Sequence, residues 1–334
     1  MSAMAGAEQA ERADTREALG RWARRNTWTL GLIGLLASFI LITKLIQPSY
    51  SAEAFQGLAI GALPLAMAAV AQAIVVISGG IDLSVGSMMA LTSVTSAALM
   101  KGQPEAFGVV VVLGVLLLGI ALGTTNGTLV VITKVPDIVV TLAMSFVWAG
   151  AALLVLNTPG GGSAEWLKGL VSGSILSDWI PRALVTMVVI VGVIWIPLRR
   201  STTGLALYAV GSDRLAAFRS GVSVGRTKIL AYALTGLFSA FGGLALTATT
   251  GIGSPVPGAY TLLGVAAIVL GGVSLAGGRG GVAGPIVAVF VLALVRTDLT
   301  LLGVNSNLST VVQGTILIGV VMFGSLLTMR RVRR

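Results

Sequence analysis

The sequence predicts an all-α, polytopic membrane protein with about ten transmembrane helices and an internal repeat. Hydrophobic residues make up 55% of its 334 residues and charged residues only 10%, whereas soluble domains carry about 25% charged residues. The apolar blocks are roughly 17 to 25 residues long, the length that a helix needs to cross about 30 Å of hydrocarbon. Blocks such as 109–118 do not alternate apolar with polar residues, as the strands of a transmembrane barrel would.

Three regions follow one another along the chain. Residues 1–27 are expected to form a helix on the cytoplasmic membrane surface, because acids precede arginines by one helical turn. Residues 28–328 are expected to form the transmembrane domain, and residues 329–334 a basic cytoplasmic tail. The expected spans are 28–46, 57–78, 85–100, 107–132, 138–156, 183–198, 228–250, 260–275, 283–302 and 307–328.

The positions of the cations predict the orientation. Arginines cluster before the first span and after the last, and the loop over about residues 199–228 holds six cations. In the longest loop of the opposite side, residues 157–182, two cations accompany two acids, so that loop suits the periplasm. Both termini and the 199–228 loop are therefore expected in the cytoplasm, with the chain embedded in the lipid bilayer of a bacterial inner membrane.

The chain contains no histidine and no cysteine, which makes catalysis a poor hypothesis. These residues supply most zinc and haem ligands, thiol nucleophiles and imidazole acid–base groups. A membrane enzyme would need a nucleophile with its base or a metal cluster, and the scattered carboxylates form neither. No catalytic residue, metal site or bound cofactor is therefore predicted. The net charge of +10 lies at membrane edges, so nucleic-acid binding is not predicted either.

Small residues mark one helix face. Gly119, Gly123 and Gly127 follow one another at four-residue spacing within one expected span. This spacing places them on one side of a helix, where a neighbouring backbone approaches closely. The sequence therefore predicts a close helix contact along this face.

Two glycine-rich segments resemble each other. The segment 79–86, Gly-Gly-Ile-Asp-Leu-Ser-Val-Gly, aligns with 271–278, Gly-Gly-Val-Ser-Leu-Ala-Gly-Gly, and each follows an apolar run. Transporters built from repeated units carry such interrupted helices along the translocation pathway. The alternative is that short glycine-rich turns look alike by chance. The candidate pathway or gating residues are Gly79, Gly80, Asp82, Ser84, Gly271, Gly272 and Ser274.

Asp82 is the most informative charge among these residues. It lies between two apolar runs, where a carboxylate at membrane depth needs water, a cation or helix amides. One interpretation is a structural or gating role beside the pathway. The other is that Asp82 caps the helix that follows it.

The sequence contains no ATP-binding signature. The seven glycines of residues 271–284 lack the Gly-Lys-Ser/Thr ending of a phosphate loop and predict a tight connection between two spans. If ATP drives transport, the motor is another chain, and the 199–228 loop is its expected docking site. Residues 213–219 predict a short amphipathic helix that ends before Gly221, with Leu215 and Phe218 as an apolar ridge. Alternatively, this basic loop orients the chain against anionic lipid.

Three motifs, in the same order, resemble the ribose-type family of ABC importer permeases. They are residues 79–87, residues 208–222 with Ala216-Ala217-x-x-x-Gly221, and residues 269–280. The resemblance covers roughly residues 28–327. It implies a dimer with a second permease copy or a homologue, cytoplasmic ATPase subunits that bind ATP and magnesium, and a periplasmic solute-binding protein.

The resemblance also assigns the coupling element. Ala216-Ala217-x-x-x-Gly221 is similar to the motif with which importer permeases enter a cleft of their ATPase. Leu215 stands where many importers have glutamate, and Asp213 where this family often has asparagine. Both departures leave the docking geometry open. The residues that the resemblance places at the ATPase are Asp213, Arg214, Leu215, Ala216, Ala217 and Gly221.

The expected function is therefore a permease subunit without an ATPase site of its own, carrying a sugar, polyol or similar small solute. Related permeases carry nucleosides or branched-chain amino acids, which is the first alternative. A secondary transporter driven by an ion gradient is the second, and it would need ion-coordinating groups near the membrane midplane, where Asp82 is the one convincing candidate.

Overall fold

The structure is a computed structural model, which describes residues 27–256, 258–305, 308–309, 311–312, 314–315 and 319. All but the last residue of the predicted surface helix at 1–27, nearly all of the tenth expected span at 307–328, and the basic tail at 329–334 lie outside these residues. The predicted count of ten spans therefore stays a prediction.

The described chain is all-α apart from one small β-ribbon. Six described helices are long and apolar enough to cross a membrane: α3 (Ala52–Ile77), α5 (Phe107–Thr133), α6 (Asp137–Val155), α8 (Arg182–Arg200), α11 (Val224–Thr250) and α13 (Ala283–Leu301). Three further apolar helices are α2 (Thr27–Ile46), α4 (Val85–Met100) and α12 (Tyr260–Leu270). These nine helices coincide with the first nine expected spans, and the polytopic fold class is confirmed.

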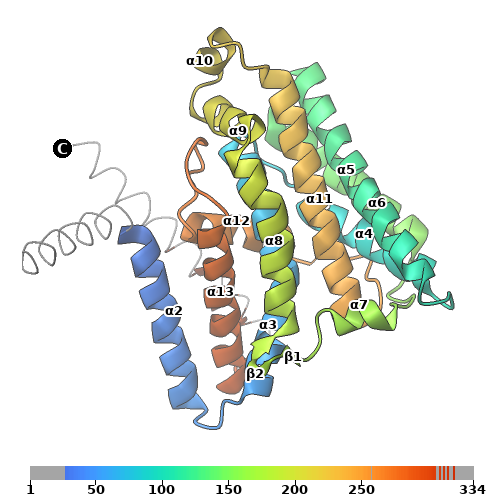
Figure 1. Cartoon of the computed structure of the whole chain (residues 1–334), viewed down its shortest axis with the longest axis vertical. Helices are drawn as coiled ribbons and strands as arrows, with labels where there is room; N and C mark the ends of the chain where they lie inside the picture. Colours follow the sequence, from blue (N-terminus) through green and yellow to red (C-terminus); the bar gives the residue numbers. More distant parts are fainter. Residues whose placement is uncertain are drawn as a thin grey trace, which may run out of the picture.

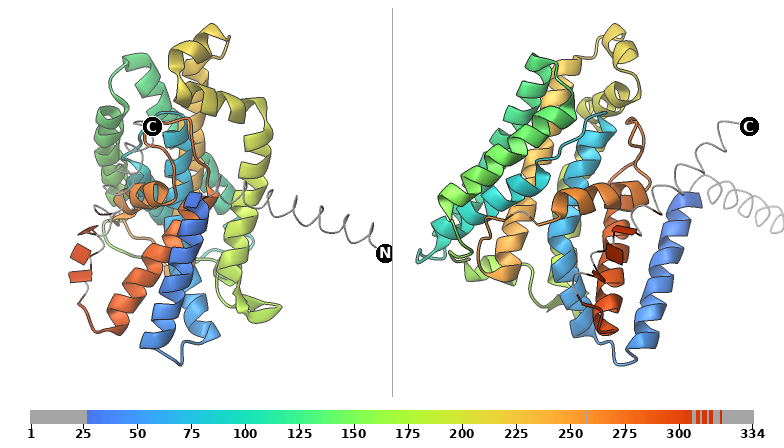
Figure 2. Two further views of the ribbon diagram at one scale, coloured as in Figure 1. Left: turned by 90° about the vertical axis from the view of Figure 1, so that its left-hand side faces the viewer. Right: turned by 180° about the vertical axis from the view of Figure 1, so that it is seen from behind.

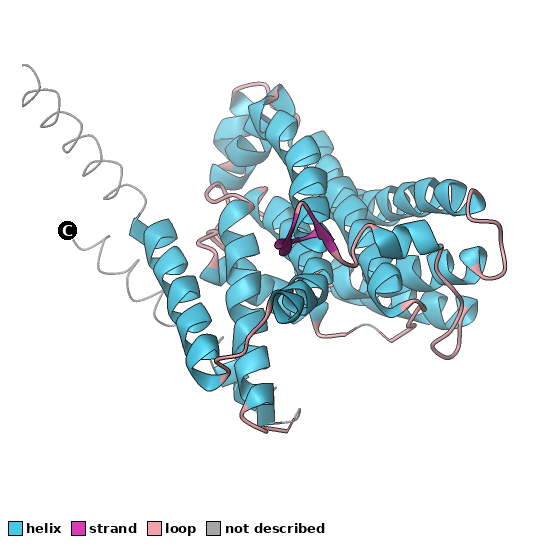
Figure 3. Ribbon diagram, turned by 60° about the horizontal axis from the view of Figure 1, so that its bottom comes forward, coloured by secondary structure: helices cyan, strands magenta, loops and turns pink. Residues whose placement is uncertain are grey.

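Short elements connect the spans at the two ends of the bundle. At one end lie α9 (Thr202–Ser212) and α10 (Arg214–Arg219), and at the other lie α7 (Glu165–Gly169), β1 (Ser174–Ile175) and β2 (Ser177–Pro181). The first is called the α10 end below, and Figure 1 shows it at the top. Figure 1 labels β1 and β2 at the opposite end, and Figure 3 shows their small ribbon in magenta with that end turned toward the viewer. The loops at 157–182 and 199–228 thus lie at opposite ends, as predicted.

Helices dominate because hydrocarbon offers no hydrogen-bond partner, so each backbone group must be paired within its own segment. The core lies along α3 and α11. Every α3 residue from Ala62 to Ile77 is buried, and α11 buries its small residues against α3, α4 and α5. By contrast, α6 buries only Thr141 and Ala152 and exposes an apolar surface.

The predicted glycine face forms the contact between α5 and α11. A Cβ at Gly123 would overlap the Tyr232 carbonyl oxygen, and one at Gly127 would lie 2.9 Å from the Ile229 Cα. On the other helix, Gly236 abuts the backbone of Gly119. Because no side chain separates the two backbones, the helices lie as close as backbones allow.

The remaining helices form the other side of the bundle. Figure 1 shows α2 and α13 on one side and α5 and α6 on the other, with α3 and α8 between them. The buried Thr43 hydroxyl donates to Asp298 Oδ1 over 2.7 Å and ties α2 to α13. In the rear view of Figure 2, the short helix α12, in orange, lies across the axes of its neighbours.

Three helix boundaries differ from the prediction. Helix α12 ends at Leu270 instead of residue 275, because Gly272 adopts a φ of +79° and turns the chain. Helix α3 begins at Ala52, where the Ser51 hydroxyl accepts a hydrogen bond from the Ala54 amide. Helix α11 begins at Val224, so the first residues of this helix come from the expected loop.

Candidate functional site

Helix α10 forms a small apolar knob at the α10 end. Leu215 is 57% exposed and Phe218 is 66% exposed, although both are large apolar side chains. The Asp213 carboxylate begins the helix by accepting from the amides of Leu215 and Ala216 over 2.8 and 3.0 Å. The predicted short helix is thus present. Asparagine at position 213 would make the same cap, so this departure from the family pattern preserves the local geometry.

The Ala216-Ala217-x-x-x-Gly221 motif has a local structural explanation. Ala217 is 5% exposed and faces inward, while Ala216 lies on the exposed side. Gly221 adopts a φ of +84° and ends the helix, and the following Val222 amide donates to the Ala217 carbonyl over 3.0 Å. This is the glycine-terminated helix cap in which a side chain would be strained.

The two glycine-rich segments end their helices in the same way. After α3, the Gly80 amide donates to the Val75 carbonyl over 2.9 Å and Gly79 has a φ of +74°. After α12, the Val273 amide donates to the Ile268 carbonyl over 2.9 Å and Gly272 has a φ of +79°. The resemblance is therefore structural, but Gly79 corresponds to Gly272, one residue away from the sequence alignment.

Two glycine turns and one helical glycine meet where α3 ends, in what is called the glycine junction below: the turns at Gly79 and Gly277-Gly278, and Gly211 in the last turn of α9. The Gly278 amide donates to the Ile77 carbonyl over 2.9 Å. A Cβ at Gly211 would overlap that same carbonyl oxygen, and one at Gly277 would lie 3.0 Å from the Gly79 Cα. The junction therefore joins α9, the end of α3 and the connection between α12 and α13.

Two side chains of the 199–228 loop hold the glycine junction together. The Arg214 guanidinium donates to the Gly79 carbonyl over 2.6 Å, and the Tyr208 hydroxyl donates to the Gly280 carbonyl over 2.8 Å. Partial burial raises the pKa of the Tyr208 hydroxyl despite the nearby Arg199, so this group remains a donor at neutral pH.

Asp82 lies in the turn before α4 and binds Ser84, the residue that precedes this helix. It is fully buried, and its Oδ1 accepts from the Ser84 amide over 2.8 Å and from the Ser84 hydroxyl over 2.6 Å. The Ser84 hydroxyl in turn accepts from Asn126 over 2.7 Å. These bonds fix the turn before α4 against α5. In the described structure Asp82 accepts from no amide within α4, so it binds the residue before this helix and does not cap the helix, contrary to the second interpretation. The Asp82 Oδ2 atom has no partner among the described residues.

The helices α4 and α12 are too short to span and meet at their N-termini. With 16 and 11 residues, they are about 24 and 16 Å long, against about 30 Å of hydrocarbon. The Gly86 amide donates to the Thr261 hydroxyl over 2.9 Å. Gly271, Gly272 and Ser274 lie at the opposite end of α12, where the Trp28 indole donates to the Leu270 carbonyl over 3.0 Å. Of the candidate pathway residues, Asp82 and Ser84 thus lie just before α4, whose first turn meets the start of α12, whereas Gly271, Gly272 and Ser274 lie at the other end of α12. Gly79 approaches the connection after α12 at Gly277.

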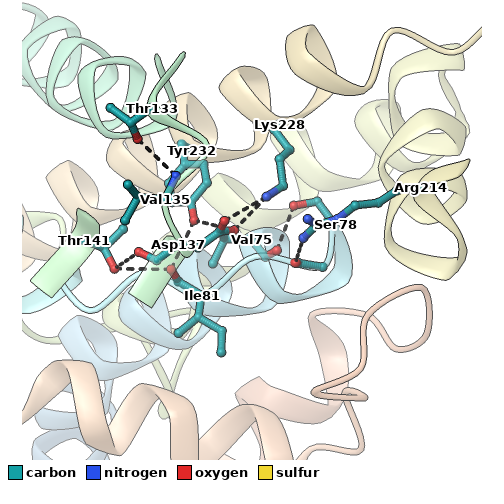
Figure 4. Close-up of polar contacts among 11 residues, drawn as sticks. Val75, Ser78, Ile81, Thr133, Val135, Asp137, Thr141, Arg214, Lys228 and Tyr232 are labelled. Atoms are coloured by element: carbon teal, nitrogen blue, oxygen red, sulfur yellow. Dashed lines mark hydrogen bonds and ion pairs between the residues drawn. The ribbon is translucent and has the colours of Figure 1, made fainter. Parts of the chain in front are cut away.

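A buried ion pair beside the glycine junction was not predicted. The Lys228 ammonium lies 2.9 Å from Asp137, and their side chains are 7% and 15% exposed. The Tyr232 hydroxyl lies 3.1 Å from both Asp137 Oδ2 and the Ile81 carbonyl, as Figure 4 shows. Asp137 opens α6 and Lys228 lies in the second turn of α11. The available sequence signal was an acid at the start of one apolar helix and a lysine just inside another.

Among the described residues, no group of three or more acidic side chains could hold a metal ion. What the arrangement offers instead is mechanical. Helix α10, which carries the exposed apolar knob, is tied through Arg214 to the turn after α3. The connection after α12 binds the same end of α3, and residues 79–84 lead from there to the start of α4.

Comparisons with known proteins identify the family. The family described as "Branched-chain amino acid transport system / permease component" matches residues 55–321. The ribose import permease protein of Escherichia coli (strain K12) is 32% identical over 76% of this chain and 79% of its own length. Its counterpart from Bacillus subtilis (strain 168) is 34% identical over 73% and 76%. No solved structure matches the chain.

A relative whose name gives another cargo covers more of the chain. The autoinducer 2 import system permease protein of Salmonella typhimurium (strain LT2) is 30% identical over 89% of this chain and 91% of its own length. Both kinds of relative are permease proteins of import systems. The family match at residues 55–321 runs through the glycine-rich turns, the α10 knob and the described spans after α2. The chain belongs to the ABC importer permease family that its three motifs resemble.

Proposed function

We propose that this chain is the membrane-spanning permease subunit of a bacterial ABC importer and forms the translocation pathway for a sugar, polyol or similar small solute. The relatives that import ribose and autoinducer 2 favour this cargo class over nucleosides or branched-chain amino acids. A periplasmic binding protein would deliver the solute. A second permease copy or a homologue would complete the pathway.

The observation that carries the proposal is the α10 knob. Leu215 and Phe218 are exposed on a six-residue helix at the α10 end of the bundle. An apolar ridge with a rigid cap at each end suits a groove in a protein better than a lipid surface. The occupant of this surface is then a cytoplasmic ATPase subunit that holds ATP and magnesium. The permease itself would do no chemistry.

This assignment sets the topology of the chain. The α10 end is then the cytoplasmic end, in a multi-pass protein of the inner membrane. The N-terminus of α2 lies beside the end of α12, and the connection that follows α12 meets the glycine junction. The N-terminus of the chain would then lie on the cytoplasmic side. The ribbon of β1 and β2 then lies in the periplasm, where the binding protein docks.

Binding of the ATPase to α10 is tested by a pair of matched substitutions. Leu215→Asp should reduce the ATPase that co-purifies with the chain about tenfold or more, because it places a charge in the buried centre of the interface. Leu176→Asp removes an equally large side chain, 99% exposed at the opposite end, and should leave co-purification unchanged. The measurement is the ratio of ATPase to permease after mild detergent extraction of cells that express the neighbouring genes.

Two results would count against the proposal. Equal recovery of the ATPase with both variants would remove α10 from the interface. Recovery of no ATPase with the unaltered chain would remove the ABC mechanism itself.

A further inference from the structure

Arg214 points away from the surface that the α10 knob presents. It lies on the same short helix as Leu215 and Phe218, but its guanidinium donates to the Gly79 carbonyl, 135 residues earlier in the chain. Figure 4 shows the side chain reaching toward the end of α3 beside Ser78. Arg214 is thus engaged inside this chain and is not part of the outward ridge.

The carbonyl that Arg214 binds is the natural acceptor for a cation. Gly79 follows the last turn of α3, where unpaired carbonyls give the helix end a partial negative charge. The bond is short, at 2.6 Å, as expected for a charged donor. A guanidinium therefore holds α10 against the end of the most deeply buried helix.

A second tie runs beside the first. The Gly278 amide binds the Ile77 carbonyl, and Gly211 at the end of α9 packs on that carbonyl with no side chain between them. Both elements that flank Asp213 therefore rest on α3. A displacement of the knob cannot occur without moving the end of α3 or breaking these contacts.

Each residue from Gly80 to Asp82, between Gly79 and the start of α4, contacts a neighbouring segment or the turn itself. Gly80 has no space for a Cβ, which would lie 2.9 Å from Asp137 and 3.1 Å from the Tyr232 hydroxyl. The Ile81 carbonyl accepts from Tyr232, and the next residue, Asp82, binds Ser84. Movement of Gly79 therefore reaches the first turn of α4, where Gly86 meets Thr261 of α12.

We infer that Arg214 is a positioning residue that transmits displacement of α10 to the α3–α4 turn, so that recruitment of the ATPase and coupling to the pathway depend on different residues of one helix. The inference rests on the proposed function and refines it. Leu215 and Phe218 recruit the ATPase, whereas Arg214 links the docked helix to the two short helices.

The test compares Arg214→Gln with Arg219→Gln. Arg219 carries the same charge on the same helix, and no described residue forms a hydrogen bond or ion pair with its side chain. Each variant is purified with its ATPase, reconstituted in liposomes and supplied with the binding protein. Three quantities are measured: the ATPase recovered, the ATP hydrolysis stimulated by loaded binding protein, and the solute imported per ATP.

Arg214→Gln should recruit the ATPase as the unaltered chain does, but lower both the stimulated hydrolysis and the import per ATP about fivefold or more, within the range of couplings between sites. Arg214→Lys, which retains a charged donor, should restore part of this loss. Arg219→Gln should keep the import per ATP at the unaltered value. Thermal unfolding of each purified variant shows that the fold is retained.

The inference is overturned if Arg214→Gln loses recruitment in proportion to import, because Arg214 would then contact the ATPase directly. It is also overturned if the two glutamine variants import equally per ATP. Either result leaves the proposed function standing. If the unaltered chain recruits no ATPase, the proposed function fails and this inference fails with it.

Discussion

Asp137→Asn is expected to lower the free energy of unfolding by about 3–5 kcal/mol, the usual loss when one partner of a buried ion pair is removed. The substitution leaves the Lys228 ammonium, whose side chain is 7% exposed, without its counter-charge. It also weakens one of the two acceptors that share the Tyr232 hydroxyl proton, the other being the Ile81 carbonyl at the α3–α4 turn. The measurement is thermal or denaturant unfolding of the purified chain in detergent.

A second substitution separates the pair from its surroundings. The double variant Asp137→Asn with Lys228→Met should be more stable than Asp137→Asn alone, because it removes the unpaired buried charge. Glu165→Gln breaks the exposed Lys168–Glu165 ion pair and should change stability by about 1 kcal/mol or less, although that pair is shorter, at 2.7 Å. Equal losses from the buried and the exposed pair would contradict this account.

Gly123→Ala is expected to destabilise the chain by about 2 kcal/mol or more, because a methyl group would overlap the Tyr232 carbonyl and separate α5 from α11. The Gly236 amide lies 2.9 Å from the same Cβ position, so the methyl group has no free side to occupy. The measurement is the midpoint of thermal unfolding, together with the amount of folded chain recovered from membranes.

Gly114→Ala provides the matched control for this prediction. Gly114 lies on the same helix, and a Cβ there would meet no atom within 4 Å. This variant should be as stable as the unaltered chain or slightly more stable, because alanine favours the helix over glycine. If the two alanine variants unfold at the same temperature, the close contact of α5 with α11 is wrong.

The sequence was informative wherever a property depends on neighbouring residues in the chain. Helix positions follow from apolar length, and the short helix α10 follows from Asp213, the apolar ridge and Gly221. The glycine face of α5 could also be predicted, since four-residue spacing places residues on one side of any helix. These predictions needed no knowledge of how the helices pack.

The sequence was uninformative where two distant segments meet. Asp137 and Lys228 are 91 residues apart, and each alone resembles an ordinary charge at a helix end. Thr261 was not singled out, because a threonine in an apolar segment gives no sign that it will bind the first turn of α4. Arg214 was assigned to the coupling helix, but its direction depends on α3.

The glycine-rich repeat was predicted correctly in one respect and wrongly in another. Its glycines correctly predict helix ends, since a positive φ is required at Gly79 and Gly272. The alignment placed Gly79 opposite Gly271, because a pair of glycines matches a pair of glycines in sequence. The hydrogen bonds of the caps correct this by one residue, which sequence similarity over eight positions could not resolve.

The most direct test of the central claim is import by the chain reconstituted in liposomes with its ATPase and binding protein. The probe is the radiolabelled sugar or polyol that the purified binding protein retains from a panel of pentoses, hexoses and polyols. The account predicts import only when hydrolysable ATP and magnesium are supplied on the ATPase side, with no loss when ionophores dissipate every ion gradient. Import that proceeds without ATP and follows an imposed ion gradient would contradict it and would identify an ion-coupled transporter.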